Sequence, residues 1–115
     1  MTKTVIFAFR GDPMCFVHVL LHGLEMAAKG MGGEIIIEGD AVKLVSEMAK
    51  PGHFLHQLYV KAKTQGLILG ACRACSTKLG VAQAVAAENV ALIGEMSGHP
   101  SMSAYLEKGF NVITF

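Results

Sequence analysis

The chain has 115 residues, of which 52% are hydrophobic and 17% charged, and its formal net charge is +1 at pH 7. This length predicts one domain, residues 1–115, with a real hydrophobic core but no room for a separate substrate domain. The basic residues are scattered, which argues against nucleic acid as a partner. Because no apolar run approaches the ~20 residues of a membrane helix, we expect no membrane insertion and a cytoplasmic location.

The apolar content and the cysteines add two expectations. A hydrophobic fraction of 52% is high for a small domain, so we expect part of the apolar surface to be buried between the subunits of a homo-oligomer. The cysteines number three, an odd count that argues against a disulfide framework in a reducing compartment. The thiols are therefore expected to be reactive, metal-binding or simply buried.

Short apolar runs alternate with segments of helical period along the chain. The first helix has the clearest boundaries, because Asp12 can cap it, Pro13 suits its first position and Gly30 can end it. In chain order, the predicted ranges are 5–9 (strand), 13–29 (helix), 34–38 (strand), 41–50 (helix), 53–64 (helix), 67–69 (strand), 76–88 (helix), 90–93 (strand), 100–109 (helix) and 112–115 (strand).

This alternation predicts a three-layer, flavodoxin-like α/β domain, with a five-stranded, mainly parallel sheet and helices on both faces. Reactive groups in such folds gather at the carboxyl ends of the strands. That rule places residues 10–15, 39–40, 70–75 and 95–99 on one rim. All three cysteines fall in these segments.

Cys72 is the strongest candidate for chemistry, because it follows the third predicted strand and precedes a helix. The helix N-terminus and the nearby cations Arg73 and Lys78 favour thiolate over thiol, which lowers a thiol pKa. Cys72 is therefore predicted to be a nucleophile at neutral pH, with Arg73 as a contact for a charged substrate. The alternative is a small apolar residue that fills the end of a strand.

Cys75 completes a Cys-x-x-Cys motif with Cys72, a spacing found in redox dithiols and in half of a zinc site. Zinc would need two further ligands, and no second Cys-x-x-Cys motif or closely spaced histidine pair follows. No metal is therefore expected. A dithiol redox module and an oligomeric binding or assembly protein with a structural or metal-binding motif stay as alternatives.

Two further residues are candidates for substrate binding beside Cys72. Cys15 lies in the first turn of the first predicted helix and either faces Cys72 across the rim or packs beside Phe16. His99 follows the fourth predicted strand, where it is suited to act as an acid-base partner or an anion contact.

Cofactor chemistry common on such rims is disfavoured. The chain has no Gly-x-x-x-x-Gly-Lys-Ser/Thr phosphate loop, and the glycines at 30, 32 and 33 link a helix to a strand, the wrong order for a dinucleotide turn. The first rim loop, residues 9–13, lacks the hydroxyl groups that would cradle a flavin phosphate. No cofactor is therefore expected.

The segment 72–80, the apolar strand before it, Gly66 at the start of that strand and the closing segment 109–115 together resemble the DsrE/DsrF-like family, which includes the sulfur-relay Tus proteins. The resemblance covers essentially the whole chain, and its most specific part is the segment 72–80. It implies a DsrE-like fold and assembly into homo-oligomers or hetero-oligomers.

The resemblance also implies a function. Members of the family carry sulfur as a persulfide on a cysteine at the position that matches Cys72. The chain is then expected to be a small cytoplasmic sulfurtransferase or sulfur carrier that accepts sulfane sulfur on Cys72 and exchanges it with donor or acceptor proteins. Cys75 departs from the simplest family pattern, and it would allow a persulfide to be resolved into a disulfide with release of sulfide.

Overall fold

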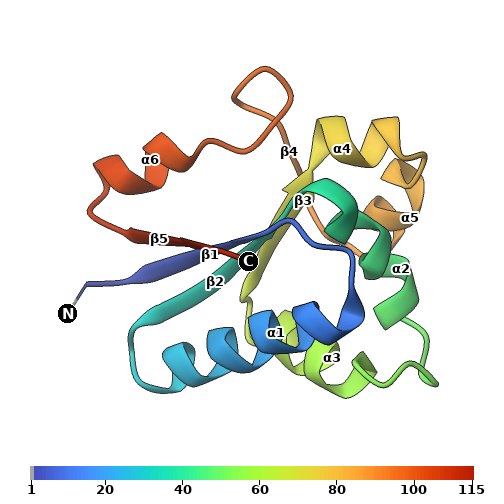
Figure 1. Ribbon diagram of the computed structural model, residues 1–115, viewed down its shortest axis with the longest axis horizontal. Helices are drawn as coiled ribbons and strands as arrows, with labels where there is room; N and C mark the ends of the chain where they lie inside the picture. Colours follow the sequence, from blue (N-terminus) through green and yellow to red (C-terminus); the bar gives the residue numbers. More distant parts are fainter. Residues whose placement is uncertain (1) are drawn as a thin grey trace.

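A computed structural model describes residues 2–115, and it contains one five-stranded sheet between helices (Figure 1). The strand order is β4-β3-β2-β1-β5, and every neighbouring pair is parallel. The predicted α/β class is therefore confirmed, and the sheet is parallel throughout. The strands are β1 (Thr4–Ala8), β2 (Gly32–Ile37), β3 (Ile68–Cys72), β4 (Leu92–Ile93) and β5 (Asn111–Thr114).

Seven helical segments connect these strands. The long first helix begins as predicted, because the Asp12 side chain accepts a hydrogen bond from the Met14 N–H at 2.8 Å and Pro13 is its first residue. None of the helices within residues 2–115 has the length and apolar character that a bilayer crossing requires. The segments are α1 (Pro13–Ala28), η1 (Gly39–Lys43), α2 (Leu44–Met48), α3 (His56–Thr64), α4 (Arg73–Lys78), α5 (Ala82–Ala87) and α6 (Met102–Glu107).

Two predicted helices are each divided in the structure. The range 41–50 consists of a 3₁₀ segment, η1, followed by α2. The range 76–88 consists of α4 and α5, which are separated at Gly80, where φ is +74°. A left-handed residue ends a helix, so the single long helix predicted there was wrong.

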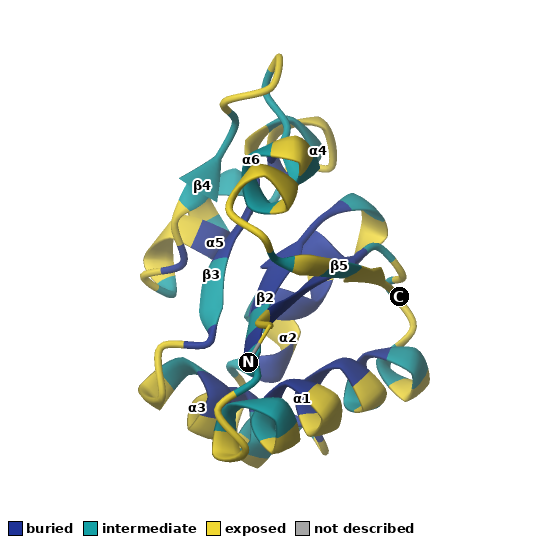
Figure 2. Cartoon of the chain, turned by 90° about the vertical axis from the view of Figure 1, so that its left-hand side faces the viewer, coloured by how far each residue is buried: buried dark blue, intermediate teal, exposed yellow. Residues whose placement is uncertain are grey.

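The two faces of the sheet are covered unequally. Because side chains alternate along a strand, Ile6 and Ala8 of β1 belong to the main core, which includes buried residues of α1, α2, α3 and α5. Val5 and Phe7 point the other way, into a smaller cluster that is covered by α6. Figure 2 shows buried central strands between helices whose outer surfaces are exposed, whereas the edge strand β5 is largely exposed. Helices therefore lie on both faces, as predicted.

The register of the sheet brings two segments together at the carboxyl ends of the strands. Ile37 of β2 pairs with Ala71 of β3, so the next residues, Glu38 and Cys72, leave the sheet side by side. Cys72 also pairs with Ile93, the last residue of β4. The loop that follows β4 therefore starts beside Cys72.

Candidate thiol site

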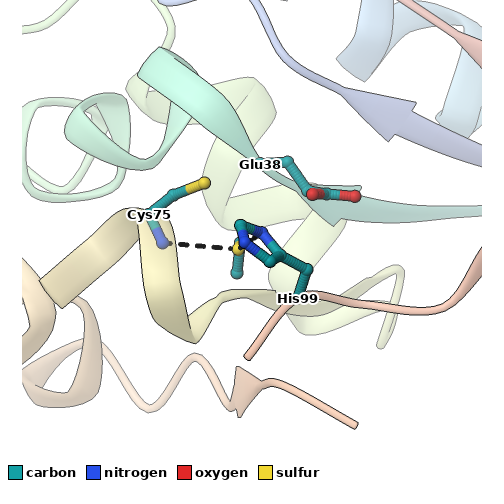
Figure 3. A group of neighbouring side chains, drawn as sticks. Glu38, Cys75 and His99 are labelled. Carbon is teal, nitrogen blue, oxygen red and sulfur yellow. Dashed lines mark hydrogen bonds between the residues drawn. The ribbon is translucent and has the colours of Figure 1, made fainter. Parts of the chain in front are cut away.

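A cluster of four side chains lies at this end of the sheet, and Figure 3 labels three of them, Glu38, Cys75 and His99. Glu38, Cys72, Cys75 and His99 each contribute one donor atom, and the four atoms all lie within 4.8 Å of one another. They come from three separate parts of the chain: the end of β2, the β3–α4 junction and the loop after β4. We call this group the thiol cluster.

Cys72 lies at the centre of the thiol cluster. It is the last residue of β3 and the N-cap of α4, and its side chain is completely buried. Its sulfur accepts a hydrogen bond from the Cys75 N–H at 3.4 Å. The three-residue spacing of the motif is that of a capping residue and the amide that it caps, so the Cys-x-x-Cys motif sets the local geometry.

His99 reaches Cys72, with its Nδ1 atom 3.1 Å from the Cys72 sulfur. A tight turn holds it there, because the backbones of Met96 and His99 bond to each other at 2.8 and 2.9 Å. The Ala74 N–H donates to the Gly98 carbonyl at 2.9 Å, which ties this turn to the first residues of α4. The sequence prediction that His99 is a site residue therefore has a geometric basis.

Gly98 is required in this turn for two reasons. Its φ is +93°, a conformation that favours glycine. A Cβ atom at this position would also approach the Cβ of Ala74 to 3.2 Å. A larger residue would therefore push the His99 loop away from α4.

Glu38 is the member of the cluster that sequence reasoning missed. The residue is 6% exposed, and no hydrogen bond to its carboxylate is found among residues 2–115. Burial raises the pKa of Glu38, His99 lowers it, and Glu95 raises it further. The available signal was a single acidic residue at the end of the isoleucine run 35–37, since charged residues are rarely fully buried without a partner.

The Cys72 thiol is not activated in the way that the sequence suggested. Burial raises the pKa of Cys72 to about 11; the hydrogen bond from the Cys75 N–H lowers it, whereas the Cys75 thiol and Glu38 raise it further. The Arg73 guanidinium donates to the Gly94 carbonyl at 3.2 Å, so it is directed to the backbone after β4. Because α4 has only six residues and Arg73 is directed away from the sulfur, the expected lowering of the pKa was wrong.

An apolar hollow of about 430 Å³ opens beside the thiol cluster. Glu38 and His99 form part of its wall, whereas Cys72 lies behind them. Small-molecule and peptide sites are commonly concave, apolar and supplied with a few polar groups. The hollow is lined by Phe9, Glu38, Met96, His99, Pro100, Met102 and Ser103.

Cys15 lies outside the thiol cluster. It lines a separate hollow of about 240 Å³ with Arg10, His18 and Phe115. Its position in the first turn of α1 therefore directs it to the C-terminal residue. The structure does not bring Cys15 together with Cys72, so it gives the expected role beside Cys72 no support.

Comparisons with known proteins place the fold and assign no activity. No family model matches the chain. It is 29% identical over 97 residues to an uncharacterised protein of Methanocaldococcus jannaschii, and the match covers 84% of this chain and 77% of that protein. A solved structure of a conserved protein of unknown function from Bacteroides thetaiotaomicron has a TM-score of 0.72 at 18% identity, with 98% of this chain and 95% of that chain covered. The structural likeness supports the α/β fold alone.

Proposed function

We propose that this protein is a sulfurtransferase or persulfide sulfur carrier, similar to the DsrE/DsrF-like proteins, that accepts sulfane sulfur on Cys72. The observation that carries the proposal is the 3.1 Å contact between the Cys72 sulfur and His99 Nδ1. A thiol within hydrogen-bond reach of an imidazole is the arrangement that generates a nucleophilic thiolate. Both groups lie on the rim where this fold gathers reactive residues.

His99 supplies the base that Cys72 needs. The buried thiol holds its proton at neutral pH, and the imidazole nitrogen is positioned to take that proton directly. The resulting thiolate keeps the hydrogen bond from the Cys75 N–H. Hydrogen bonds from backbone amides stabilise developing negative charge without reorganisation.

The loading step is neutral in oxidation and reduction. The Cys72 thiolate attacks the outer sulfur of a donor persulfide, a new S–S bond forms at Cys72, and the S–S bond of the donor breaks. The donor leaves as a thiolate and takes the proton held by His99. Delivery is the reverse step, in which an acceptor thiolate attacks the outer sulfur on Cys72.

The hollow beside His99 provides the approach for the donor. It is largely apolar, and Met96 at its edge is 52% exposed. His99 lines the hollow and contacts the buried Cys72 sulfur, so we propose that the 95–99 turn moves when sulfur is loaded. Protein partners that present a persulfide on a mobile segment fit this geometry better than a bulky small molecule.

Assembly and location are part of the same proposal. The exposed large side chains include Leu106 on α6 and Ile113 on the edge strand β5, which are 57% and 41% exposed. Covering them between copies of the chain would remove apolar surface from water. The unloaded carrier needs a free Cys72 thiol, which a reducing compartment maintains, so we propose a cytoplasmic location. Light scattering after size exclusion should give the mass of an oligomer, and a monomer would contradict the assembly.

Sulfur loading tests the proposed function. The reduced, metal-free protein is exposed to glutathione persulfide, and its intact mass is measured without reductant before the modified peptide is mapped. We expect a gain of one sulfur atom on Cys72, removable by dithiothreitol. The Cys72→Ser variant should gain none, whereas Cys15→Ser should load like the wild type because Cys15 lies in a separate hollow.

Two results would contradict the proposed sulfur-carrier function. One is sulfur that maps to Cys15 or Cys75 in the wild-type protein while Cys72 stays unmodified. The other is equal loading of Cys72→Ser and wild type. A His99→Gln variant adds a readout of the base, because it should slow loading while the final stoichiometry stays the same.

A further inference from the structure

The thiol cluster has the composition of a metal centre. Tetrahedral zinc holds its ligands at about 2.0–2.3 Å, which places the ligand atoms about 3.3–3.8 Å apart. The Cys72 sulfur and His99 Nδ1 are already 3.1 Å apart, and all four donor atoms lie within 4.8 Å of one another. Small side-chain rotations are therefore enough to close the set around one ion.

We propose that Glu38, Cys72, Cys75 and His99 together bind one divalent cation of the zinc class. Two thiolates and an imidazole are soft to borderline ligands that favour zinc over magnesium or calcium. Four protein ligands in a tetrahedral set are typical of a closed zinc site. The proposal rests on this donor set and stands independently of the sulfur-carrier function.

Glu38 gives an independent reason to place a cation here. The residue is only 6% exposed, no hydrogen bond to its carboxylate is found among residues 2–115, and it lines the hollow beside the cluster. A buried carboxylate without a partner costs stability, so such groups are usually paired or coordinate a metal. The cation-bearing side chain beside the cluster, Arg73, donates to Gly94 instead.

The surrounding backbone holds the ligands in position before any ion binds. Glu38 and Cys72 are fixed by the pairing of β2 with β3. Cys75 is fixed by the first turn of α4, and the 95–99 turn is anchored to that helix through the Ala74 N–H and the Gly98 carbonyl. Outer-shell contacts of this kind orient metal ligands and contribute to metal affinity.

Metal binding and sulfur loading would compete for one atom. Both need the Cys72 sulfur as a thiolate, and a bound cation would also occupy His99, the base of the loading step. The metal-bound protein is then the form protected from sulfur transfer. This consequence rests on the proposed function, whereas the site itself does not.

Cobalt and zinc titrations test the site directly. The full chain is reduced, freed of metal with a chelator, and titrated with Co²⁺ while its absorption is recorded. We expect the near-ultraviolet thiolate-to-cobalt band and the visible bands of tetrahedral Co²⁺, with saturation at one ion per chain. One equivalent of Zn²⁺ should then abolish both sets of bands.

Variants assign the bands to the cluster. Changes outside the ligands of a metal site already cost about 10–100-fold in affinity, so Cys75→Ser should weaken Zn²⁺ binding by at least about 100-fold. Cys75 is only half-buried, so we expect this variant to fold. Circular dichroism checks that it has folded. Glu38→Gln should weaken binding by about tenfold, and Cys15→Ser should bind like the wild type.

Three results would overturn the site. They are the absence of a zinc-sensitive cobalt spectrum in the reduced wild type, an unchanged Zn²⁺ affinity in folded Cys75→Ser, and an equal loss of affinity in Cys15→Ser. The readout is separate from sulfur transfer. Zinc binding without sulfur loading would support the metal site and contradict the sulfur-carrier function. Sulfur loading without zinc binding would support the carrier function and contradict the metal site.

Discussion

Two partly buried polar clusters in this protein differ in how their groups are paired. At the α3–α5 contact, the Tyr59 hydroxyl donates to Glu88 Oε1 at 2.9 Å, and Lys63 Nζ donates to the Glu88 carbonyl at 2.7 Å. Lys63 also lies 3.3 Å from the Glu88 carboxylate. Every member has a partner, so this cluster links α3 to the end of α5 and has a structural role.

The thiol cluster has the opposite character. Its members converge closely, yet Glu38, which is only 6% exposed, has no hydrogen bond to its carboxylate among residues 2–115. Perturbed titratable groups in a cluster are a common mark of a functional site. The comparison therefore indicates a structural role for the first cluster and supports the chemistry that we propose for the second.

The largest expected effect is the loss of sulfur loading when Zn²⁺ occupies the thiol cluster. Addition of one equivalent of Zn²⁺ before glutathione persulfide should abolish loading of Cys72, because the sulfur and its base are then both metal ligands. Mass spectrometry with peptide mapping measures the loaded fraction. Mg²⁺ at the same concentration is the control, and equal loading with and without Zn²⁺ would show that the two activities do not share a site.

Alkylation rates should rank the three thiols by environment. Cys72 is buried and its pKa is raised to about 11, whereas Cys15 and Cys75 are partly exposed. Since iodoacetamide reacts with the thiolate and the Cys72 thiol is buried and protonated at rest, Cys72 should be the slowest of the three at neutral pH and should accelerate as the pH rises. Time-resolved peptide mapping measures this order. Fast alkylation of Cys72 at neutral pH would contradict the buried, protonated thiol.

Tyr59→Phe should weaken the cluster of Tyr59, Lys63 and Glu88 and leave the thiol cluster unchanged. It removes a hydrogen bond to a carboxylate at a partly exposed site, so we expect a loss of about 1–2 kcal/mol in the free energy of unfolding. Urea denaturation measures the loss. Zinc affinity and sulfur loading should stay at the wild-type values, and a parallel fall in either would mean that the two clusters are coupled.

Glu38→Gln should change stability less than Tyr59→Phe does, and in the opposite direction. Burial raises the pKa of Glu38 above its ordinary value of 4.5, so the folded chain binds this proton more tightly than the unfolded chain does. The stabilisation is full below pH 4.5 and is lost as the pH rises through the folded-state pKa. At neutral pH the neutral glutamine should therefore leave the metal-free protein as stable as the wild type or slightly more stable.

Paired urea denaturation of the two metal-free proteins at neutral pH measures this difference. A clear loss of stability in Glu38→Gln would show that the carboxylate has a stabilising partner. The thiol cluster would then resemble the Tyr59 cluster, and the contrast between them would be lost.

The sequence predicted the sheet well, because patterns of adjacent residues determine it. Apolar runs, the Asp12 cap and the Gly30 stop all act within a few residues of one another. The division of the fourth predicted helix was missed, although Gly80 carries the signal in its preference for positive φ. The strand order depends on packing between distant segments, and no local pattern in this chain encodes it.

The site was predicted only where its residues are close in sequence or follow a general rule of the fold. Cys72 and Cys75 are close in sequence, and the rim rule brings His99 to the same edge. Glu38 could not be connected with them, because its position beside Cys72 follows from the register of β2 against β3. The raised pKa of Cys72 was also out of reach, since burial and the orientation of Arg73 depend on the assembled fold.

The central claim is that Cys72 carries sulfur between partner thiols, and an isotopically labelled sulfane sulfur tests it most directly. The metal-free protein is loaded with the label, separated from the donor and mixed with an acceptor thiol, and the label is followed by mass spectrometry. We predict that the label leaves Cys72 and appears on the acceptor as a persulfide in equal amount. Release of the label as sulfide, with a disulfide left between Cys72 and Cys75, would contradict the carrier and establish a dithiol redox reaction instead.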